Sequence, residues 1–392
     1  MRTFGTQAIG IRAPIIHEGD DLPEIVVNAI MEYSKETGSP ICDQDIIGIT
    51  EAVVARAQGN YATVAQIAAD IKNKFSSGIV GVVFPILSRN RFSVLLKGIA
   101  AAVDQLYIQL SYPADEVGNH IISEEQIYES GINPYSDVFS EQEFREYFPD
   151  LKHKFTAIDY LELYHNLGNQ AEIILANDPC EILKYTKNVI VADIHTRAQT
   201  KQRLLAGGAE TVFGLDEILT ASINSSGYND TYGLLGSNKA GEDKVKLFPH
   251  SCEAFIAKVQ KLMLERMGVK VEVLIYGDGA FKDPVGKIWE LADPTVSPAF
   301  TNGLIGLPNE LKLKYIADNE FGDKRGKEAQ MAIIERIRCK QKNLKGREET
   351  EGTTPRRLSD LIGSLCDLIS GSGDKGTPII LIKGYFDNYA SE

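Results

Sequence analysis

Three aspartates that follow a strongly apolar run are the first sign of chemistry in this chain. Asp278, Asp283 and Asp293 stand among glycines, prolines and lysines, just after the apolar residues 271–276. Carboxylates on glycine-rich backbone at the end of a strand suit a hard cation such as Mg²⁺ or Mn²⁺, and the phosphates that the cation carries. The same residue types also build surface turns. On these residues alone, both interpretations stay open.

A second candidate is the glycine-rich stretch 371–376. Backbone N–H groups near Gly373 would cradle phosphate oxygens, and Lys375 would add positive charge. The glycines precede an apolar run and do not open a helix, so the stretch is not a Walker A loop. A flexible hairpin connection is the alternative interpretation.

Arg56 is a third candidate, because it lies between alanines just past another apolar run. Arginine makes bidentate contacts with phosphate or carboxylate, although a surface salt bridge is the common alternative. The histidines show no paired spacing, and the five cysteines are widely separated. A zinc site or a disulfide framework is therefore not expected.

Short apolar runs must position these side chains, and most of them have the length of buried strands. We expect strands over 46–50, 79–87, 172–176, 189–192, 211–213, 271–276 and 379–383. We expect helices over 22–33, 196–206, 253–267 and 325–340. Strands and helices alternate in the middle of the chain, which is typical of a small parallel sheet. The fold class is therefore predicted to be α/β (α+β).

The composition limits partners and location. With 392 residues, 43 % of them hydrophobic, the chain is long enough for two or three domains. A net charge of −13 without a basic stripe argues against nucleic acid, so a phosphate ligand would need a metal or local Lys and Arg residues. No apolar run reaches the roughly 20 residues that span a bilayer, and the start does not read as a signal peptide. We expect a cytoplasmic protein without a membrane partner.

Taken together, several stretches resemble the coenzyme F420-0:gamma-glutamyl ligase family. Those that carry the resemblance are 13–22, 50–59, 101–104 with 112–116, and 274–278. The stretch 371–378 resembles the family's last nucleotide-contacting loop. Family members use GTP and a divalent metal to join L-glutamate, by an amide bond, to the carboxylate of a phosphate-containing deazaflavin.

The resemblance implies roles for particular residues. Asp104 and Asp278 would hold Mg²⁺ or Mn²⁺, with Asp374 as a further ligand. The residues expected to contact GTP are Ala13, Pro14, Ile15, Ile16, Glu51, Arg56, Lys282, Ser372, Gly373 and Lys375. As our own hypothesis, Asp283 or Asp293 would act in catalysis by orienting a second metal or taking the proton of the amine.

The sequence departs from the family pattern around the nucleotide. Gly279 stands where the family has Thr or Ser, and Tyr107 where it has Asn. Ser372 stands where a Gln ligand is expected, so Asp374 is the replacement. Two other functions therefore stay open: an amide ligase for a different acid and amine, and a non-catalytic regulatory protein that binds nucleotide or metal.

The resemblance also implies a division of the chain. Residues 1–119 and 251–392 would form a mixed-sheet, ligase-like core. Residues 120–250, without a counterpart in the family, would form an inserted small α/β domain. The implied partners are a small-molecule acid, L-glutamate, the nucleotide and a second copy of the chain in a homodimer.

Overall fold

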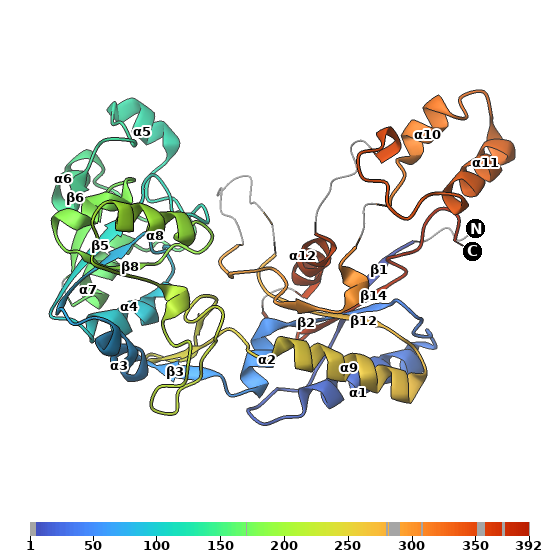
Figure 1. The fold of residues 1–392 in the computed structure, drawn as a ribbon, viewed down its shortest axis with the longest axis horizontal. Helices are drawn as coiled ribbons and strands as arrows, with labels where there is room; N and C mark the ends of the chain where they lie inside the picture. The colour runs from blue at the N-terminus through green and yellow to red at the C-terminus, as the bar shows by residue number, and fades with distance from the viewer. Residues whose placement is uncertain are drawn as a thin grey trace.

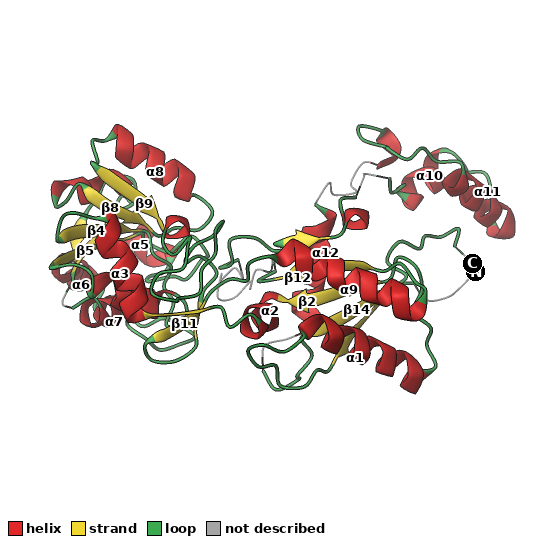
Figure 2. Cartoon of the chain, turned by 60° about the horizontal axis from the view of Figure 1, so that its bottom comes forward, coloured by secondary structure: helices red, strands yellow, loops and turns green. Residues whose placement is uncertain are grey.

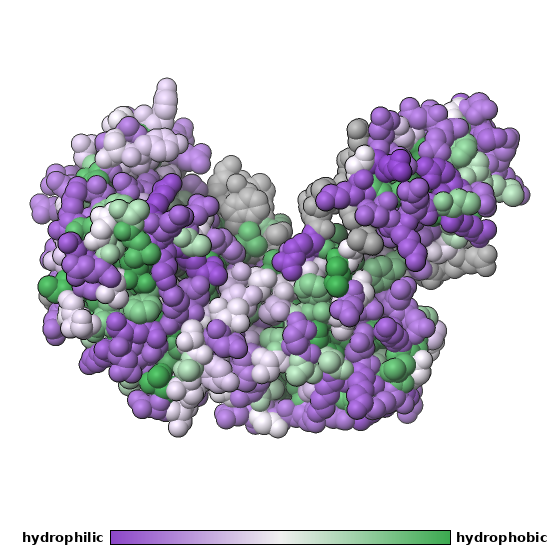
Figure 3. All heavy atoms as spheres, viewed as in Figure 1, coloured by the Kyte–Doolittle hydropathy of each residue, from purple (hydrophilic) through white to green (hydrophobic). Residues whose placement is uncertain are grey.

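The computed structural model describes residues 5–169, 171–279, 281, 291–306, 309–350, 357–370 and 373–391. The chain forms two lobes, each built on its own sheet, and a helical arm projects from the lobe that contains β1, β12 and β14 (Figure 1). The arm contains α10 (Leu313–Asn319) and α11 (Gly326–Arg338). Figure 3 shows that hydrophilic residues dominate the outer surface of both lobes and of the arm in this view. The expected α/β class is confirmed.

The first lobe is built on a five-stranded sheet with the order β1-β14-β2-β12-β13. The strands are β1 (Gln7–Ile11), β14 (Ile379–Lys383), β2 (Ile46–Thr50), β12 (Glu272–Tyr276) and β13 (Ala299–Phe300). Strands β2 and β12 are parallel, whereas β14 is antiparallel to both of its neighbours. The inner strands read as continuous apolar runs because helices cover both faces of the sheet.

Two helices pack on one face of this sheet and one on the other. The helices α1 (Leu22–Thr37) and α9 (Cys252–Met267) lie side by side on one face (Figure 2). The opposite face is covered by α12 (Leu358–Ser370), whose Ile362 and Cys366 pack against Leu274 and Ile380. The helix expected over 253–267 and the strands expected at 46–50, 271–276 and 379–383 are therefore confirmed.

The second lobe contains a six-stranded sheet with the order β6-β7-β5-β4-β8-β9. Its strands are β4 (Ile79–Val83), β5 (Gln105–Leu110), β6 (Phe139–Ser140), β7 (Glu172–Leu175), β8 (Asn188–Val191) and β9 (Thr211–Gly214). All neighbouring pairs are parallel except β6 with β7. From β4 the chain builds outward in one direction through β5 and β7. It then returns to build the other side with β8 and β9, so the strand order reverses between β4 and β8.

Several shorter elements complete this lobe. Its helices are α3 (Val64–Lys74), α4 (Phe92–Ala100), α5 (Glu124–Ser130), α6 (Glu141–Tyr147), α7 (Tyr160–Leu167) and α8 (Arg197–Ala206). A small three-stranded sheet joins β3 (Tyr61–Thr63), β10 (Asn238–Lys239) and β11 (Lys244–Lys246). The helix α2 (Glu51–Ala57) leads from β2 toward this lobe and lies near the junction (Figure 1).

The six-stranded sheet does not follow the domain boundary that the sequence indicated at residues 119 and 120. Strands β4 and β5 were assigned to the ligase-like core, but Val82 pairs with Ile190 of β8 and Ile108 pairs with Ile173 of β7. The boundary therefore cuts through one sheet. Its position was wrong because an apolar run indicates a buried strand without indicating which partner strand it pairs with.

Candidate active site

One edge of the five-stranded sheet gathers the stretches that carry the family resemblance, apart from the one around Asp104. Because β1, β2 and β12 point the same way and β14 runs against them, the segments 12–19, 51–58, 277–279 and 373–378 all meet at this edge. Three backbone hydrogen bonds tie these segments to one another and to the end of β2. The N–H of Ala13 donates to the carbonyl of Gly376 at 3.2 Å, Gly19 to Ala57 at 2.9 Å, and Thr50 to Pro378 at 3.0 Å.

The residues expected to contact nucleotide differ in accessibility. Ile15 is 73 % exposed, and the exposed set also includes Pro14, Arg56, Gly373, Asp374 and Lys375. Ala13 is half-buried, whereas Ile16 is buried in the core beneath α1, where it cannot contact a ligand. Lys282, Asp283 and Ser372 lie outside the described residues.

Arg91 is the charged centre of the junction, and it comes from the other lobe. It follows the carboxyl end of β4 and directly precedes α4. Its Nη2 donates to Asp278 Oδ2 at 2.6 Å, and its Nη1 donates to Asp293 Oδ1 at 2.7 Å. The side chain of Asp293 is 1 % exposed and that of Asp278 is 29 % exposed. One guanidinium therefore ties both Asp278 and Asp293, which lie between β12 and β13 of the first lobe, to the second lobe.

Arg91 was not among the residues predicted from the sequence. The only available signal was an arginine in a polar run just past an apolar strand, which is the same signal that singled out Arg56.

Burial and neighbouring charges shift the proton equilibria of this cluster. Burial, and then the charge of Asp293, raise the pKa of Asp278 to about 7, although Arg91 acts in the opposite direction. Burial lowers the pKa of Arg91, but Asp293 and Asp278 outweigh that effect and the net shift is upward. The carboxyl of Asp278 therefore exchanges a proton near neutral pH.

Glu51, which the sequence predicted as a nucleotide contact, lies at the start of α2, next to this cluster. Its side chain is 5 % exposed, and Lys246 Nζ donates to its two carboxylate oxygens at 2.8 and 2.6 Å. Burial raises the pKa of Glu51, and Lys246 counteracts the shift. In this arrangement Glu51 and Lys246 form a second buried ion pair between the lobes.

Asp104 is not a neighbour of Asp278 in this structure. It is exposed and precedes β5, where its N–H donates to the carbonyl of Gly78 at 2.8 Å. Arg91 follows β4, which is parallel to β5, whereas Asp104 precedes β5. The two residues therefore lie at opposite ends of these parallel strands. A strand of this length separates its ends by roughly 16 Å. The expected pairing of Asp104 with Asp278 is therefore not formed.

Comparison with protein families decides the membership of the chain. A family model described as F420-0:Gamma-glutamyl ligase matches residues 10–384. The chain belongs to this family. The matched range covers nearly the whole chain and runs through both lobes, and it agrees with the resemblance carried by the stretches at the sheet edge. A comparison with curated proteins gives no match. Within the described residues, no helix combines the length and apolar character needed to cross a membrane.

The structure gives a physical reason for one departure from the family pattern. Gly279 stands where the resemblance implies a Thr or Ser, and its N–H donates to Asp367 Oδ2 at 2.9 Å. A Cβ added at Gly279 would lie only 2.8 Å from the Cα of Ser364 in α12. A hydroxyl-bearing side chain has no room there, because the helix packs directly against the backbone. In this family member, α12 occupies the space of the missing side chain.

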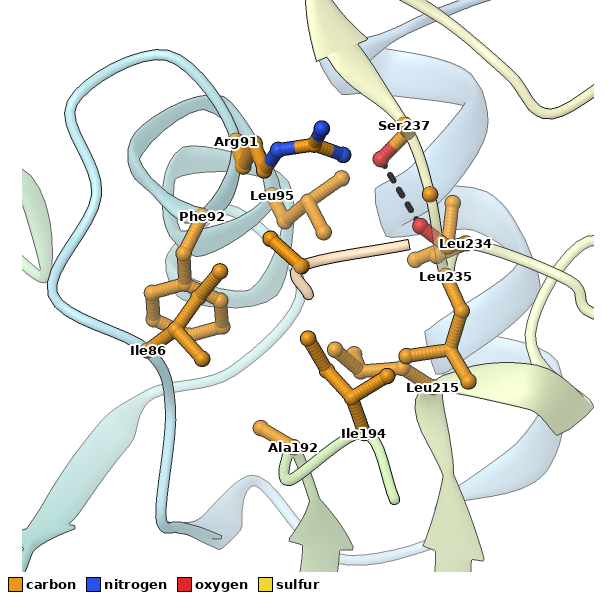
Figure 4. A pocket seen from close by; sticks show the side chains of 12 residues that line it. Ile86, Arg91, Phe92, Leu95, Ala192, Ile194, Leu215, Leu234, Leu235 and Ser237 are labelled. Atoms are coloured by element: carbon orange, nitrogen blue, oxygen red, sulfur yellow. Dashed lines mark hydrogen bonds between the residues drawn. The ribbon is translucent and has the colours of Figure 1, made fainter. Parts of the chain in front are cut away.

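A narrow, mostly apolar pocket lies beneath Arg91 (Figure 4). Its walls come from the segments that follow β4, β8 and β9, and they include Ile86, Ile194 and Leu215. This is the place where the strand order of the six-stranded sheet reverses, and open α/β sheets commonly bind ligands at such a point. The pocket therefore places an apolar surface next to the Arg91 cluster.

Two further contacts order the rim of this pocket. Glu116 accepts hydrogen bonds from the backbone N–H groups of Ile194 at 2.6 Å and Thr196 at 2.7 Å, just before α8. His195 Nε2 lies 2.7 Å from the carbonyl oxygen of Leu291, which belongs to the loop that carries Asp293. The carboxyl end of β8 is thus linked to the first lobe independently of Arg91.

The loop that carries Arg91 is fixed by the buried hydroxyl of Tyr164. This hydroxyl donates to the carbonyl of Ile86 at 2.6 Å and accepts from the N–H of Ser88 at 2.8 Å. We expect Tyr164→Phe to lower the free energy of unfolding by about 2 kcal/mol, because both backbone groups lose their partner. Urea unfolding followed by circular dichroism measures this change. Tyr128→Phe, at an 88 % exposed position, is the control and should match the wild type.

Proposed function

We propose that this chain is an amide ligase that joins L-glutamate to a carboxylic acid, using a nucleoside triphosphate and Mg²⁺ or Mn²⁺. In the family that the sequence resembles, the nucleotide is GTP and the acid is a deazaflavin. The observation that carries the proposal is the convergence of the segments 12–19, 51–58 and 373–378 at the sheet edge next to Asp278 and Asp293. At this edge, exposed loops that would contact the nucleotide lie next to the carboxylates of Asp278 and Asp293, which are 29 % and 1 % exposed.

The donor set at this edge fits a hard cation of the Mg²⁺ type. Mg²⁺ is usually held by one or two carboxylates, with phosphate and water oxygens completing its shell. Asp278 and Asp293 provide two such carboxylates, which share one guanidinium. In the described part of the chain, no cluster of three or more His, Cys, Asp or Glu side chains is arranged to hold a metal by itself. The bound ion would neutralise phosphate charge, with Asp278 as its principal protein ligand.

The proposed reaction proceeds through an acyl phosphate. An oxygen of the acid attacks the γ-phosphorus, and the bond to the β-phosphate oxygen breaks to release the nucleoside diphosphate. The nitrogen of glutamate then attacks the acyl carbon, inorganic phosphate leaves, and the amine loses its proton. Such chemistry needs positioning and charge neutralisation more than covalent help from the protein. Arg56 and Lys375 are exposed cations at this edge that would meet phosphate oxygens.

Asp293 could accept the proton of the amine only after a rearrangement. Its Oδ1 accepts from Arg91, and its Oδ2 accepts from the N–H of Asp278 at 2.8 Å. Arg91 would have to release Asp293 when substrates bind. In the structure as it stands, Asp293 orders the loop that presents Asp278.

A coupled assay for phosphate release tests the proposal. Purified protein is mixed with GTP or ATP, Mn²⁺, L-glutamate and either the deazaflavin acid or a panel of other carboxylic acids. We expect phosphate release that requires both the acid and glutamate, together with a product whose mass equals their sum minus water. Protection against thermal unfolding by nucleotide, without phosphate release in any mixture, would contradict the ligase and favour a regulatory binding protein.

A further inference from the structure

A second hollow lies on the first lobe, away from the Arg91 cluster. It is a groove of about 230 Å³ between α9 and the segment that follows β13. Its lining includes Gln260 of α9, Lys270 and Glu272 at the start of β12, and Thr301 and Asn302 beyond β13. Glu272 opens β12, whereas Asp278 follows its end, so the two carboxylates are separated by roughly 20 Å of strand. The groove is therefore a different site from the candidate active site.

The base of the groove is the carboxylate of Glu272, which is 6 % exposed. Its Oε2 accepts hydrogen bonds from the hydroxyl of Thr301 and from the N–H of Gly303, the latter at 3.1 Å. In the part of the chain that the structure describes, no Lys, Arg or His side chain forms an ion pair with Glu272, and its Oε1 accepts no hydrogen bond. Among the described residues Oε1 has no hydrogen-bond partner, and it is not fully sealed from solvent, so it is accessible to solvent.

A nearly buried carboxylate without a cationic partner is costly. The accessible Oε1 of Glu272 therefore offers a place for an ammonium group that enters through the groove. The close packing of Gly303 reinforces this placement, because a Cβ at that position would lie 2.2 Å from Oε1. Only glycine leaves the carboxylate in its observed position.

The rest of the groove defines the remainder of the ligand. Lys270 is exposed at the rim and supplies a positive charge for a carboxylate. Ile256 and Phe300 add apolar side chains to the lining of the groove. We propose that the groove binds a free α-amino acid with an apolar side chain, its ammonium group on Glu272 and its carboxylate toward Lys270. This site is separate from the one that would take L-glutamate as a substrate, and it does not depend on the proposed ligase activity.

Titration calorimetry on the full chain without nucleotide tests this inference. The probes are L-leucine, isoamylamine as the amine without a carboxylate, and 4-methylvalerate as the carboxylate without an amine. We expect L-leucine to bind more tightly than either analogue. Glu272→Gln should weaken L-leucine by at least about tenfold, whereas Glu265→Gln on the exposed face of α9 should leave it unchanged. Glu272→Gln keeps an acceptor for Thr301 and Gly303, so the fold should persist.

A steric pair of variants keeps the inference testable without touching the carboxylate. Ala257 and Ala254 are both exposed on α9, but only Ala257 lines the groove. We expect Ala257→Trp to abolish L-leucine binding and Ala254→Trp to preserve it. The inference is overturned if L-leucine does not bind at millimolar concentrations. It is equally overturned if L-leucine binds Glu272→Gln and Ala257→Trp as tightly as it binds the wild type.

Discussion

Replacing Arg91 with alanine is expected to lower the free energy of unfolding by about 3 kcal/mol and to loosen the junction between the lobes. The guanidinium is the cation that contacts both Asp278 and Asp293, at 2.6 and 2.7 Å. Without it, the carboxylate of Asp293, which is 1 % exposed in the folded chain, loses the charge of Arg91 and lies next to the carboxyl of Asp278. Removing one partner of a buried ion pair costs more than the pair itself contributes, because the remaining charge stays desolvated.

This loss of stability should depend on pH in a defined direction. Burial and Asp293 raise the pKa of Asp278 to about 7 in the folded chain. Between about pH 4 and pH 7, the folded state therefore holds a proton that the unfolded chain has released. The contribution of Asp278 to stability thus falls as the pH rises through this window. Removing Arg91 raises the pKa of Asp278 further, so the variant should lose more stability relative to the wild type at pH 8 than at pH 5.

Urea unfolding at pH 5 and pH 8, followed by circular dichroism, measures both effects. Arg89→Ala is the matched control, because Arg89 lies in the same loop with an exposed side chain. We expect Arg89→Ala to change the unfolding midpoint little at either pH. Equal shifts for the two variants would show that the loop, and not the ion pairs of Arg91, sets the stability of the junction.

Local sequence signals predicted much of the fold correctly. Thr63 and Gln66, three residues apart, form a reciprocal capping box at the start of α3. The arm helix expected over 325–340 is observed as α11, Gly326–Arg338. The strand expected over 79–87 is shorter, because β4 ends at Val83 and Phe84 has a φ of 56°. These features depend on residues close together in sequence, so periodicity and capping residues identify them.

The composition of the candidate site could be predicted only in part. Asp278 was found because strand, glycine and acid adjoin in the sequence. Asp104 lies away from Asp278 because it precedes β5, whereas Asp278 follows β12. Arg91 and the Glu51–Lys246 pair depend on how two separate sheets face each other. Single-sequence patterns carry no information on such long-range pairing, so these contacts could not be anticipated.

Replacing Asp278 with asparagine is expected to weaken nucleotide binding in the presence of Mn²⁺ by about 100-fold. Even the partners that only support metal ligands typically contribute about 10- to 100-fold in metal affinity. Asparagine has the same shape and can still accept a hydrogen bond from Arg91, so the loop should keep its structure. It lacks the negative charge that a divalent cation requires. Without metal, the affinities of the variant and the wild type should agree within about twofold.

Fluorescent GTP analogues, titrated with and without Mn²⁺, measure this difference, and Asp104→Asn is the decisive comparison. The sequence predicted Asp104 as a second metal ligand, whereas the structure places it at the opposite end of the parallel strands β4 and β5 from Arg91. We therefore expect Asp104→Asn to bind nucleotide as tightly as the wild type. If Asp278→Asn stays within about twofold of the wild type with Mn²⁺, the metal role of Asp278 is wrong. If both variants lose binding equally, the two carboxylates must meet in a nucleotide-bound arrangement of the lobes that differs from this one.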